Sequence, residues 1–309
     1  MKTSGSIVGR VQVVLSVGVG LAAMLGGGGR ALGCASCGCG DPTLTAMGTE
    51  KPFAGRLRLS LEQRLSGHVE ADGTRARLLS RTLLAASYSP LAWLTVAAQL
   101  PWVTVVRYDS PRAPVWHSGL GDLELYGRAL VYRDRSFSPR HLLGMLLGLK
   151  LPTGPRIRNS AGYPAADDEQ PGSGSWDPVL GVSYAYFGGR LSVQTSASYR
   201  HSTFGRRDYK RGAQLGGSAA LQYAAHPRLG LGLGTDVLYQ RSDEMKADTG
   251  EPVSLTATGG VQLALTPQLL WSPRTDWLLR LAVQLPVLQR WHDDHKEYPT
   301  LLLGLVVDI

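Results

Sequence analysis

Apolar and polar residues alternate along much of this chain. In residues 191–200 (LSVQTSASYR), Leu191 and Val193 fall on one face, and polar side chains fall on the other. Successive side chains of a β-strand point to opposite faces, so this segment predicts a strand with one apolar and one polar face. Residues 56–64 and 122–132 repeat the pattern.

About a dozen such segments follow one another. Each is longer than the roughly 5–6 residues usual in soluble sheets. Each is also long enough for a tilted membrane strand, which needs about 9–11 residues in the bilayer. They lie near residues 55–66, 76–88, 91–104, 119–133, 141–152, 176–187, 190–201, 211–225, 229–241, 254–266, 275–287 and 298–309.

The joints between the segments alternate between mostly short turns and longer polar loops, as in outer-membrane barrels. Aromatic residues gather near both ends of the segments, where membrane interfaces favour amphipathic rings. Tyr126, in the middle of a segment, is an exception. The aromatic residues expected at the periplasmic interface are Tyr88, Trp93, Tyr132, Tyr184, Tyr186, Tyr223 and Trp277, and those expected at the outer interface are Trp102, Trp116, Trp176, Tyr199, Tyr239, Trp291 and Tyr298.

These features together predict an all-β protein, a closed antiparallel transmembrane β-barrel of about 12 strands over residues 55–309. A soluble β-sandwich would share the alternation, but not the strand length, the loop asymmetry and the two aromatic belts. Closing the sheet pairs every backbone polar group, which lipid requires.

The N-terminus predicts export to the outer membrane. Lys2 and Arg10 give a positive start before an apolar run over residues 11–25. The small residues Ala31 and Gly33 then stand at the two positions that a signal peptidase reads. Residues 1–33 are therefore expected to be a signal peptide. A membrane anchor and lipidation at Cys34 are the alternatives. Residues 34–54 would form a cysteine-containing periplasmic segment, with both ends of the mature chain in the periplasm.

Composition excludes two other classes. Glycine contributes 38 of 309 residues, only 18% are charged, and the mean hydropathy is −0.06. A helical membrane protein would have a strongly positive hydropathy, and a disordered chain would carry more charge. The net charge of +8 includes three basic residues of the leader and is therefore a weak clue.

Two motifs resemble those of a known family. Residues 119–123 (GLGDL) open one segment, and residues 147–154 (LGLKLPTG) end the next. This pattern resembles outer-membrane transporter-like barrels of the family labelled "MetA-pathway of phenol degradation". The resemblance implies passage of small, often aromatic or otherwise hydrophobic, compounds across the outer membrane. The motifs cover only residues 119–154, although the layout of most of the mature chain agrees.

The polar face would line the lumen, where rings of charge can select permeant ions. The alternative is a network of paired charges that plugs a narrow lumen, so the sequence leaves open a passive channel for small molecules and a non-conducting barrel. The charged residues expected to point inward are Arg58, Glu62, Arg64, Asp122, Glu124, Arg128, Lys150, Arg200, Asp236 and Arg280.

The cysteines Cys34, Cys37 and Cys39 form a compact CxxCxC motif. Three thiolates this close could hold a soft metal ion or exchange disulfides. The second hypothesis for the function is therefore a non-conducting barrel whose N-terminal cysteine segment binds a metal ion or a periplasmic partner. A c-type haem is not expected, because Gly38 stands where such a site needs histidine. No other cofactor is expected, and the partners expected are outer-membrane lipids, the barrel-assembly machinery and a small-molecule permeant, without nucleic acid.

An enzyme is the least favoured alternative. A lipase of the outer membrane would need a serine beside an activating histidine. The adjacent pairs His117-Ser118 and His201-Ser202 point to opposite faces of a strand, which disfavours a dyad. Residues 155–174, rich in Pro, Gly and Ser, predict a mobile loop.

Overall fold

A computed structural model describes residues 54–69, 75–109, 114–136, 139–158, 165, 169–247, 249–292 and 295–309. The expected signal peptide and the CxxCxC segment lie outside these residues. The described part is 72% strand and contains no helix long and apolar enough to cross a membrane.

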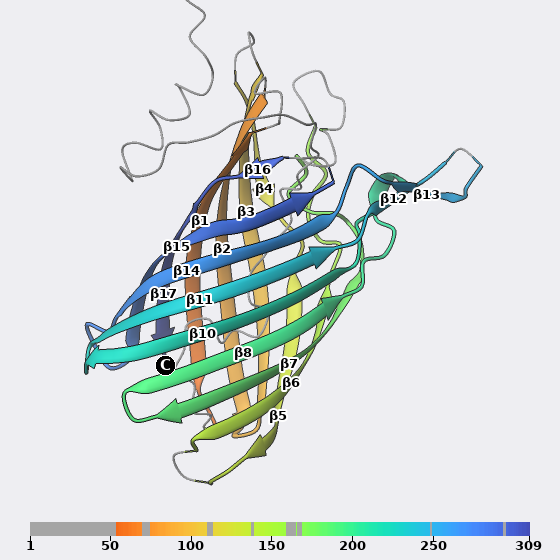
Figure 1. Cartoon of the computed structure of the whole chain (residues 1–309). Coiled ribbons are helices and arrows are strands. Elements are labelled where there is room, and N and C mark those ends of the chain that lie inside the picture. The colour runs from red at the N-terminus through yellow and green to blue at the C-terminus, as the bar shows by residue number, and fades with distance from the viewer. Residues whose placement is uncertain are drawn as a thin grey trace, which may run out of the picture.

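Twelve strands form one closed antiparallel barrel, which confirms the fold predicted from the alternation (Figure 1). The fourth barrel strand is interrupted at residues 121–123 and therefore consists of two pieces, both paired with the third strand. In order around the wall the barrel strands are β1 (Leu57–Val69), β2 (Arg75–Leu91), β3 (Leu94–Asp109), β4 (Val115–Leu120) with β5 (Glu124–Arg133), β6 (His141–Lys150), β7 (Asp177–Gly188), β8 (Leu191–Arg200), β10 (Gln214–His226), β11 (Leu229–Gln240), β14 (Gly260–Trp271), β15 (Trp277–Trp291) and β17 (Thr300–Asp308).

The last strand closes the barrel against the first. The backbone N–H of Ile309 donates to the carbonyl of Leu57 at 2.8 Å, and Leu57 returns a bond to Ile309 at 3.1 Å. Beside this pair, Nε of Arg58 donates to Oδ1 of Asp308 at 2.7 Å. The seam thus combines ladder hydrogen bonds with an ion pair.

Five short strands were not expected from the sequence. One of them, β4, is the first piece of the interrupted fourth barrel strand and still pairs with β3. Another, β16 (Lys296–Glu297), pairs with the end of β1. The other three form a separate small sheet: β9 (Tyr209–Lys210), which follows the 3₁₀ turn η1 (Arg206–Asp208), β12 (Asp243–Lys246) and β13 (Pro252–Leu255).

The boundary predicted for the tenth segment was wrong. Residues 254–266 were expected to form one strand, but residues 252–255 belong to the small sheet and β14 begins only at Gly260. Gly259 and Gly260 have φ of +85° and +147°, a backbone conformation that L side chains rarely adopt. This glycine pair turns the chain from the small sheet into the barrel.

The two ends of the barrel differ as predicted. The joints at one end are short, covering residues 92–93, 134–140, 189–190, 227–228 and 272–276. The opposite end carries the longer connections and the small sheet, which projects to the right in Figure 1. In the longest of the short joints, Asp134 accepts backbone hydrogen bonds from His141 and Arg140, and these lower the pKa of its carboxyl.

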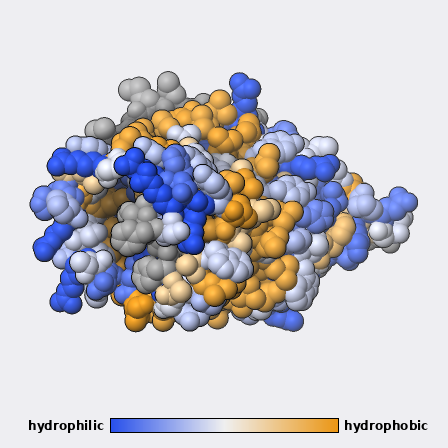
Figure 2. All heavy atoms as spheres, turned by 90° about the horizontal axis from the view of Figure 1, so that it is seen from below, coloured by the Kyte–Doolittle hydropathy of each residue, from blue (hydrophilic) through white to orange (hydrophobic). Residues whose placement is uncertain are grey.

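Large apolar side chains cover the outside of the wall. Leu84, Leu147 and Leu233 are each more than half exposed. Viewed from below, hydrophobic side chains cover broad areas of the surface, with groups of hydrophilic side chains between and beside them (Figure 2). An apolar outer surface is what lipid contact requires.

One aromatic residue departs from the predicted belts. Val287 and Leu288 are both exposed, because a β-bulge in β15 places two successive residues on the outside. Beyond the bulge, inward and outward side chains alternate again, but each residue faces the side opposite to the one expected without the bulge. Trp291 is therefore turned to the lumen face, where it stacks on His295 with ring centroids 5.1 Å apart.

Tyr126, the aromatic exception in the sequence, points into the barrel and is 5% exposed. Its ring lies over Gly148, the residue opposite it on β6. A Cβ atom added to Gly148 would lie 2.4 Å from the tyrosine ring. The glycine thus provides the space that the inward tyrosine occupies.

We expect Gly148→Val to destabilise the barrel by about 1–3 kcal/mol, because the added methyl groups overlap the ring of Tyr126. The measurement is the urea midpoint of the protein refolded in lipid vesicles. Gly127→Val is the matched control, since a Cβ at Gly127 meets nothing within 4 Å. Equal midpoints for the two variants would contradict the packing role of Gly148.

Candidate functional site

The strand register places the charged residues selected from the sequence on the inner face of the barrel. Glu124 lies opposite Lys150, which lies opposite Asp177 on β7. Asp122 lies in the break between β4 and β5 rather than within a strand. Their role in selectivity stays a prediction. The ten residues are Arg58, Glu62, Arg64, Asp122, Glu124, Arg128, Lys150, Arg200, Asp236 and Arg280.

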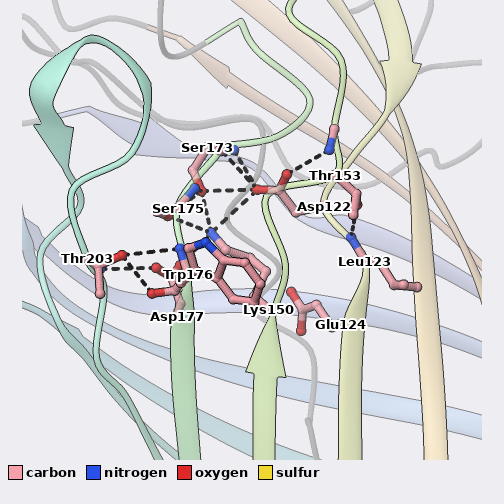
Figure 3. Close-up of polar contacts among 12 residues, drawn as sticks. Asp122, Leu123, Glu124, Lys150, Thr153, Ser173, Ser175, Trp176, Asp177 and Thr203 are labelled. Atoms are coloured by element: carbon pink, nitrogen blue, oxygen red, sulfur yellow. Dashed lines mark hydrogen bonds and ion pairs between the residues drawn. The ribbon is translucent and has the colours of Figure 1, made fainter.

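Because the fourth barrel strand is broken at residues 121–123, the side chain of Asp122 faces the loop over residues 151–176 (Figure 3). Oδ1 of Asp122 accepts the backbone N–H of Gly154 at 2.9 Å. Oδ2 accepts the backbone N–H groups of Ser173 at 2.8 Å and Gly174 at 3.1 Å. One buried carboxylate therefore fastens both ends of the loop to the barrel wall.

Glycine is required for this approach. A Cβ at Gly172 would lie 2.6 Å from Oδ1 of Asp122, and a Cβ at Gly121 would lie 2.8 Å from the carbonyl oxygen of Pro171. Gly174 has a φ of +67°, which favours glycine. The loop backbone can reach the carboxylate only because these side chains are absent.

Lys150 supplies the positive charge at this point. Its ammonium group forms an ion pair with Asp177 and lies 3.7 Å from Oδ2 of Asp122. It also donates hydrogen bonds to Ser173 and to Ser175, the latter at 3.2 Å. We call Asp122, Lys150, Ser173, Ser175 and Asp177 the latch, because they join the loop to β6 and β7.

The two sequence motifs supply most of the latch and its support. The backbone N–H of Leu123 donates to Oγ1 of Thr153 at 2.8 Å, and the carbonyl of Leu123 accepts the N–H of Leu151 at 2.8 Å. GLGDL therefore provides the carboxylate and LGLKLPTG the ammonium group and the threonine. The first motif lies just before the start of β5 and the second spans the end of β6. These two strand ends lie side by side, since Glu124 is opposite Lys150.

The described part of the loop turns into the mouth of the barrel. Glu169, 3% exposed, forms an ion pair with Arg107 of β3, and its other oxygen lies 3.3 Å from Nε2 of His117. Nη1 of Arg206 donates to the carbonyl of Gly154 at 2.7 Å. The composition of residues 155–174 predicted a mobile loop, but their described residues are anchored on several sides.

A second group of charges lies deeper in the lumen. Arg200 makes two hydrogen bonds to Glu124, at 2.9 and 3.0 Å, and Tyr126 donates a third. Glu62 accepts Nε of Arg64 at 2.5 Å and lies 3.3 Å from Nη1 of Arg280. Arg81 lies beside these groups. We call these four arginines and two glutamates the central cluster: Glu62, Arg64, Arg81, Glu124, Arg200 and Arg280.

Small side chains make up much of the inner face of β8, β10 and β11, and we call this part of the lumen the small-residue wall. The same strands also turn longer side chains inward, among them Gln194, Arg200 and Gln222. A Cβ added to Gly216 would meet only Oγ of Ser198 within 4 Å among the described residues, at 3.3 Å. The wall therefore adjoins open space there. The small residues on this face are Ser192, Ser196, Ser198, Gly216, Ser218, Ala220, Gly230, Gly232 and Gly234.

The described residues contain no group of three metal-ligating side chains. Within the same residues, the ring of His117 contacts Glu169 and the ring of His201 contacts Tyr199, and neither histidine is hydrogen-bonded to its adjacent serine. The CxxCxC motif lies outside the described residues, and its metal binding stays a prediction.

Sequence reasoning missed Asp177, Ser173, Ser175 and Arg81. Leucines at both odd and even positions of residues 78–84 obscure the alternation around Arg81. The register with Arg64 shows its direction, and register is not visible in a single strand. Ser173 and Ser175 lie in a loop, which has no period to read.

One of the comparisons with solved structures agrees with this architecture. The COG4313 outer membrane channel from Pseudomonas putida F1 superposes with a TM-score of 0.68 at 16% identity, covering 85% of this chain and 99% of that one. The translocator domain of the autotransporter NalP from Neisseria meningitidis has a TM-score of 0.48 at 12% identity, over 86% and 92%. A mutant of the monoaromatic hydrocarbon channel TodX has a TM-score of 0.43 at 10% identity, over 83% and 90%.

A search of curated proteins gave no match. The sequence itself matches the family described as "Putative MetA-pathway of phenol degradation" over residues 45–287, which include both motifs and most of the barrel. This outer-membrane β-barrel therefore belongs to that family.

Proposed function

We propose that the protein is a passive channel for small molecules. The observation that carries this proposal is the row of serine, alanine and glycine residues along the inner faces of β8, β10 and β11. At Gly216 this row adjoins open space, because an added Cβ atom would meet only Oγ of Ser198 within 4 Å among the described residues. A wall that served only to fill the barrel would be expected to carry larger side chains.

The latch defines where the path is narrowed. Residues 169–175 turn inward at the long-loop end and are held by Asp122 and Lys150. A permeant would pass between this fixed loop and the small-residue wall before it reached the central cluster. A fixed loop of this kind sets a constant width, as passive selection by size requires.

Adding bulk to the small-residue wall tests the proposal. We expect Gly216→Trp to reduce the single-channel conductance several-fold in planar bilayers, because the indole enters the open space beside Ser198. The inward direction of Gly216 follows from its register opposite Ser198 on β8.

Gly217→Trp is the matched control. Gly217 is the next residue of β10 and faces lipid, where a Cβ would meet only a carbonyl oxygen at 3.9 Å. Its conductance is expected to equal that of the unmodified protein. The proposal would be contradicted if the unmodified protein showed no conductance, or if the two variants showed equal conductance.

A further inference from the structure

Arg81 differs from the other charged residues of the lumen. Its side chain is 8% exposed. It lies directly opposite Arg64 on β1 and opposite Val103 on β3. Across a sheet, like charges in this arrangement repel one another. The position of Arg81 thus raises the question of what balances its charge.

The protein itself supplies no partner within the residues that the structure describes. No hydrogen bond or ion pair joins Arg81 to another described residue, and its Nε atom is buried without an acceptor. Glu62 and Glu124 act on it only at longer range. A buried guanidinium group in this state is costly unless an anion approaches it.

Both carboxylates of the central cluster are already engaged. Glu62 holds Arg64 and Arg280, and Glu124 holds Arg200 and the hydroxyl of Tyr126. The cluster therefore contains four guanidinium groups and two carboxylates. Its excess positive charge is concentrated where Arg81 faces Arg64.

The latch does not remove this excess at Arg81. It has one more acidic than basic group, but Lys150 lies between Asp122 and Asp177 and pairs with both. Neither aspartate lies within ion-pair distance of Arg81 in the described part of the chain. The unpaired guanidinium and the neutralised acids are thus separate features of the lumen.

We infer that Arg81 is the contact residue of an anion site in the channel, which takes the carboxylate of a small organic acid. The inference rests on the proposed function and names its substrate class. A guanidinium group offers two parallel N–H donors that match the two oxygens of a carboxylate. The small-residue wall across the lumen leaves room for the body of the acid.

The experiment combines a current and a binding measurement on the full-length protein. Under a potassium chloride gradient, the unmodified channel is expected to prefer chloride over potassium, and sodium propionate is expected to reduce the chloride current. Arg81→Met is expected to lower the chloride-to-potassium permeability ratio several-fold and to abolish the effect of propionate. Arg81→Lys keeps the charge but not the paired donors, so it should keep the chloride preference and lose most of the propionate effect.

Binding is measured independently as the rise in unfolding temperature that propionate causes in detergent, compared with equal sodium chloride and with the uncharged propionamide. Only propionate should stabilise the unmodified protein, and Arg81→Met should lose this shift. Arg274→Met, which removes a charge at an exposed turn, is the control. Retention of the heat-resistant folded band on gels shows that each variant is folded.

The outcomes separate the two proposals. If the unmodified protein shows no conductance but propionate still raises its unfolding temperature through Arg81, the channel proposal is overturned and the anion-site proposal is retained. A conducting protein whose ion preference and propionate response are the same in Arg81→Met would overturn the anion site and leave the channel. A cation-selective unmodified channel without propionate stabilisation would also overturn the anion site.

Discussion

Replacing Lys150 by methionine is expected to lower the free energy of unfolding by about 3–5 kcal/mol, since it leaves two buried carboxylates without their partner. Lys150 is 5% exposed, and Asp122 and Asp177 are buried to a similar degree. Methionine keeps most of the length of the side chain, so the loss comes from charge and hydrogen bonds rather than from a cavity.

The measurement is the urea unfolding curve in lipid vesicles at neutral pH. Lys246→Met is the control, because Lys246 of β12 pairs with the exposed Asp208 of η1 at 3.0 Å. Exposed pairs contribute only about 0.2–1 kcal/mol. If Lys150→Met unfolds at the same urea concentration as Lys246→Met, the latch does not contribute to stability as its burial implies.

The second large effect is expected from Asp122→Ala, which detaches the loop from the wall. Three backbone N–H groups lose their acceptor, and hydrogen bonds to a charged group contribute about 1.5–3 kcal/mol each. We expect the loop over residues 151–176 to open while the strands keep their pairing, because each strand retains its own ladder.

Trypsin provides the readout, since Arg156 and Arg158 lie in this loop. Cleavage there should be rapid in Asp122→Ala and slow in the unmodified protein, whereas the folded barrel persists on gels. Glu244→Ala, which breaks the partly exposed pair with Lys210, is the control. Unchanged cleavage in Asp122→Ala would mean that other contacts, such as that of Glu169 with Arg107, hold the loop alone.

Both variants change residues that the sequence motifs contain, but the motifs did not reveal what those residues do. GLGDL and LGLKLPTG identified Asp122 and Lys150 as members of a family pattern and as inward charges. Their partners Ser173, Ser175 and Asp177 lie more than twenty residues further along the chain. Only the folded loop brings these groups within hydrogen-bonding distance.

The sequence by itself determined the wall of the barrel. Alternation fixes the face of each side chain within a strand, and lipid on one side makes that alternation strong, so the closed barrel, its twelve strands and most inward charges could be predicted. Where both faces carry leucine, as near Arg81, or where a bulge shifts the period, as before Trp291, the local pattern was insufficient.

Tertiary structure alone decided which charges meet. The partner of an inward side chain depends on strand register and on the path of the loops, and neither leaves a local period in the sequence. Pairing satisfied Glu62 and Glu124 but left Arg81 opposite another arginine. The latch and the unpaired guanidinium group are therefore products of the closed barrel, because closure brings side chains from distant strands into one lumen.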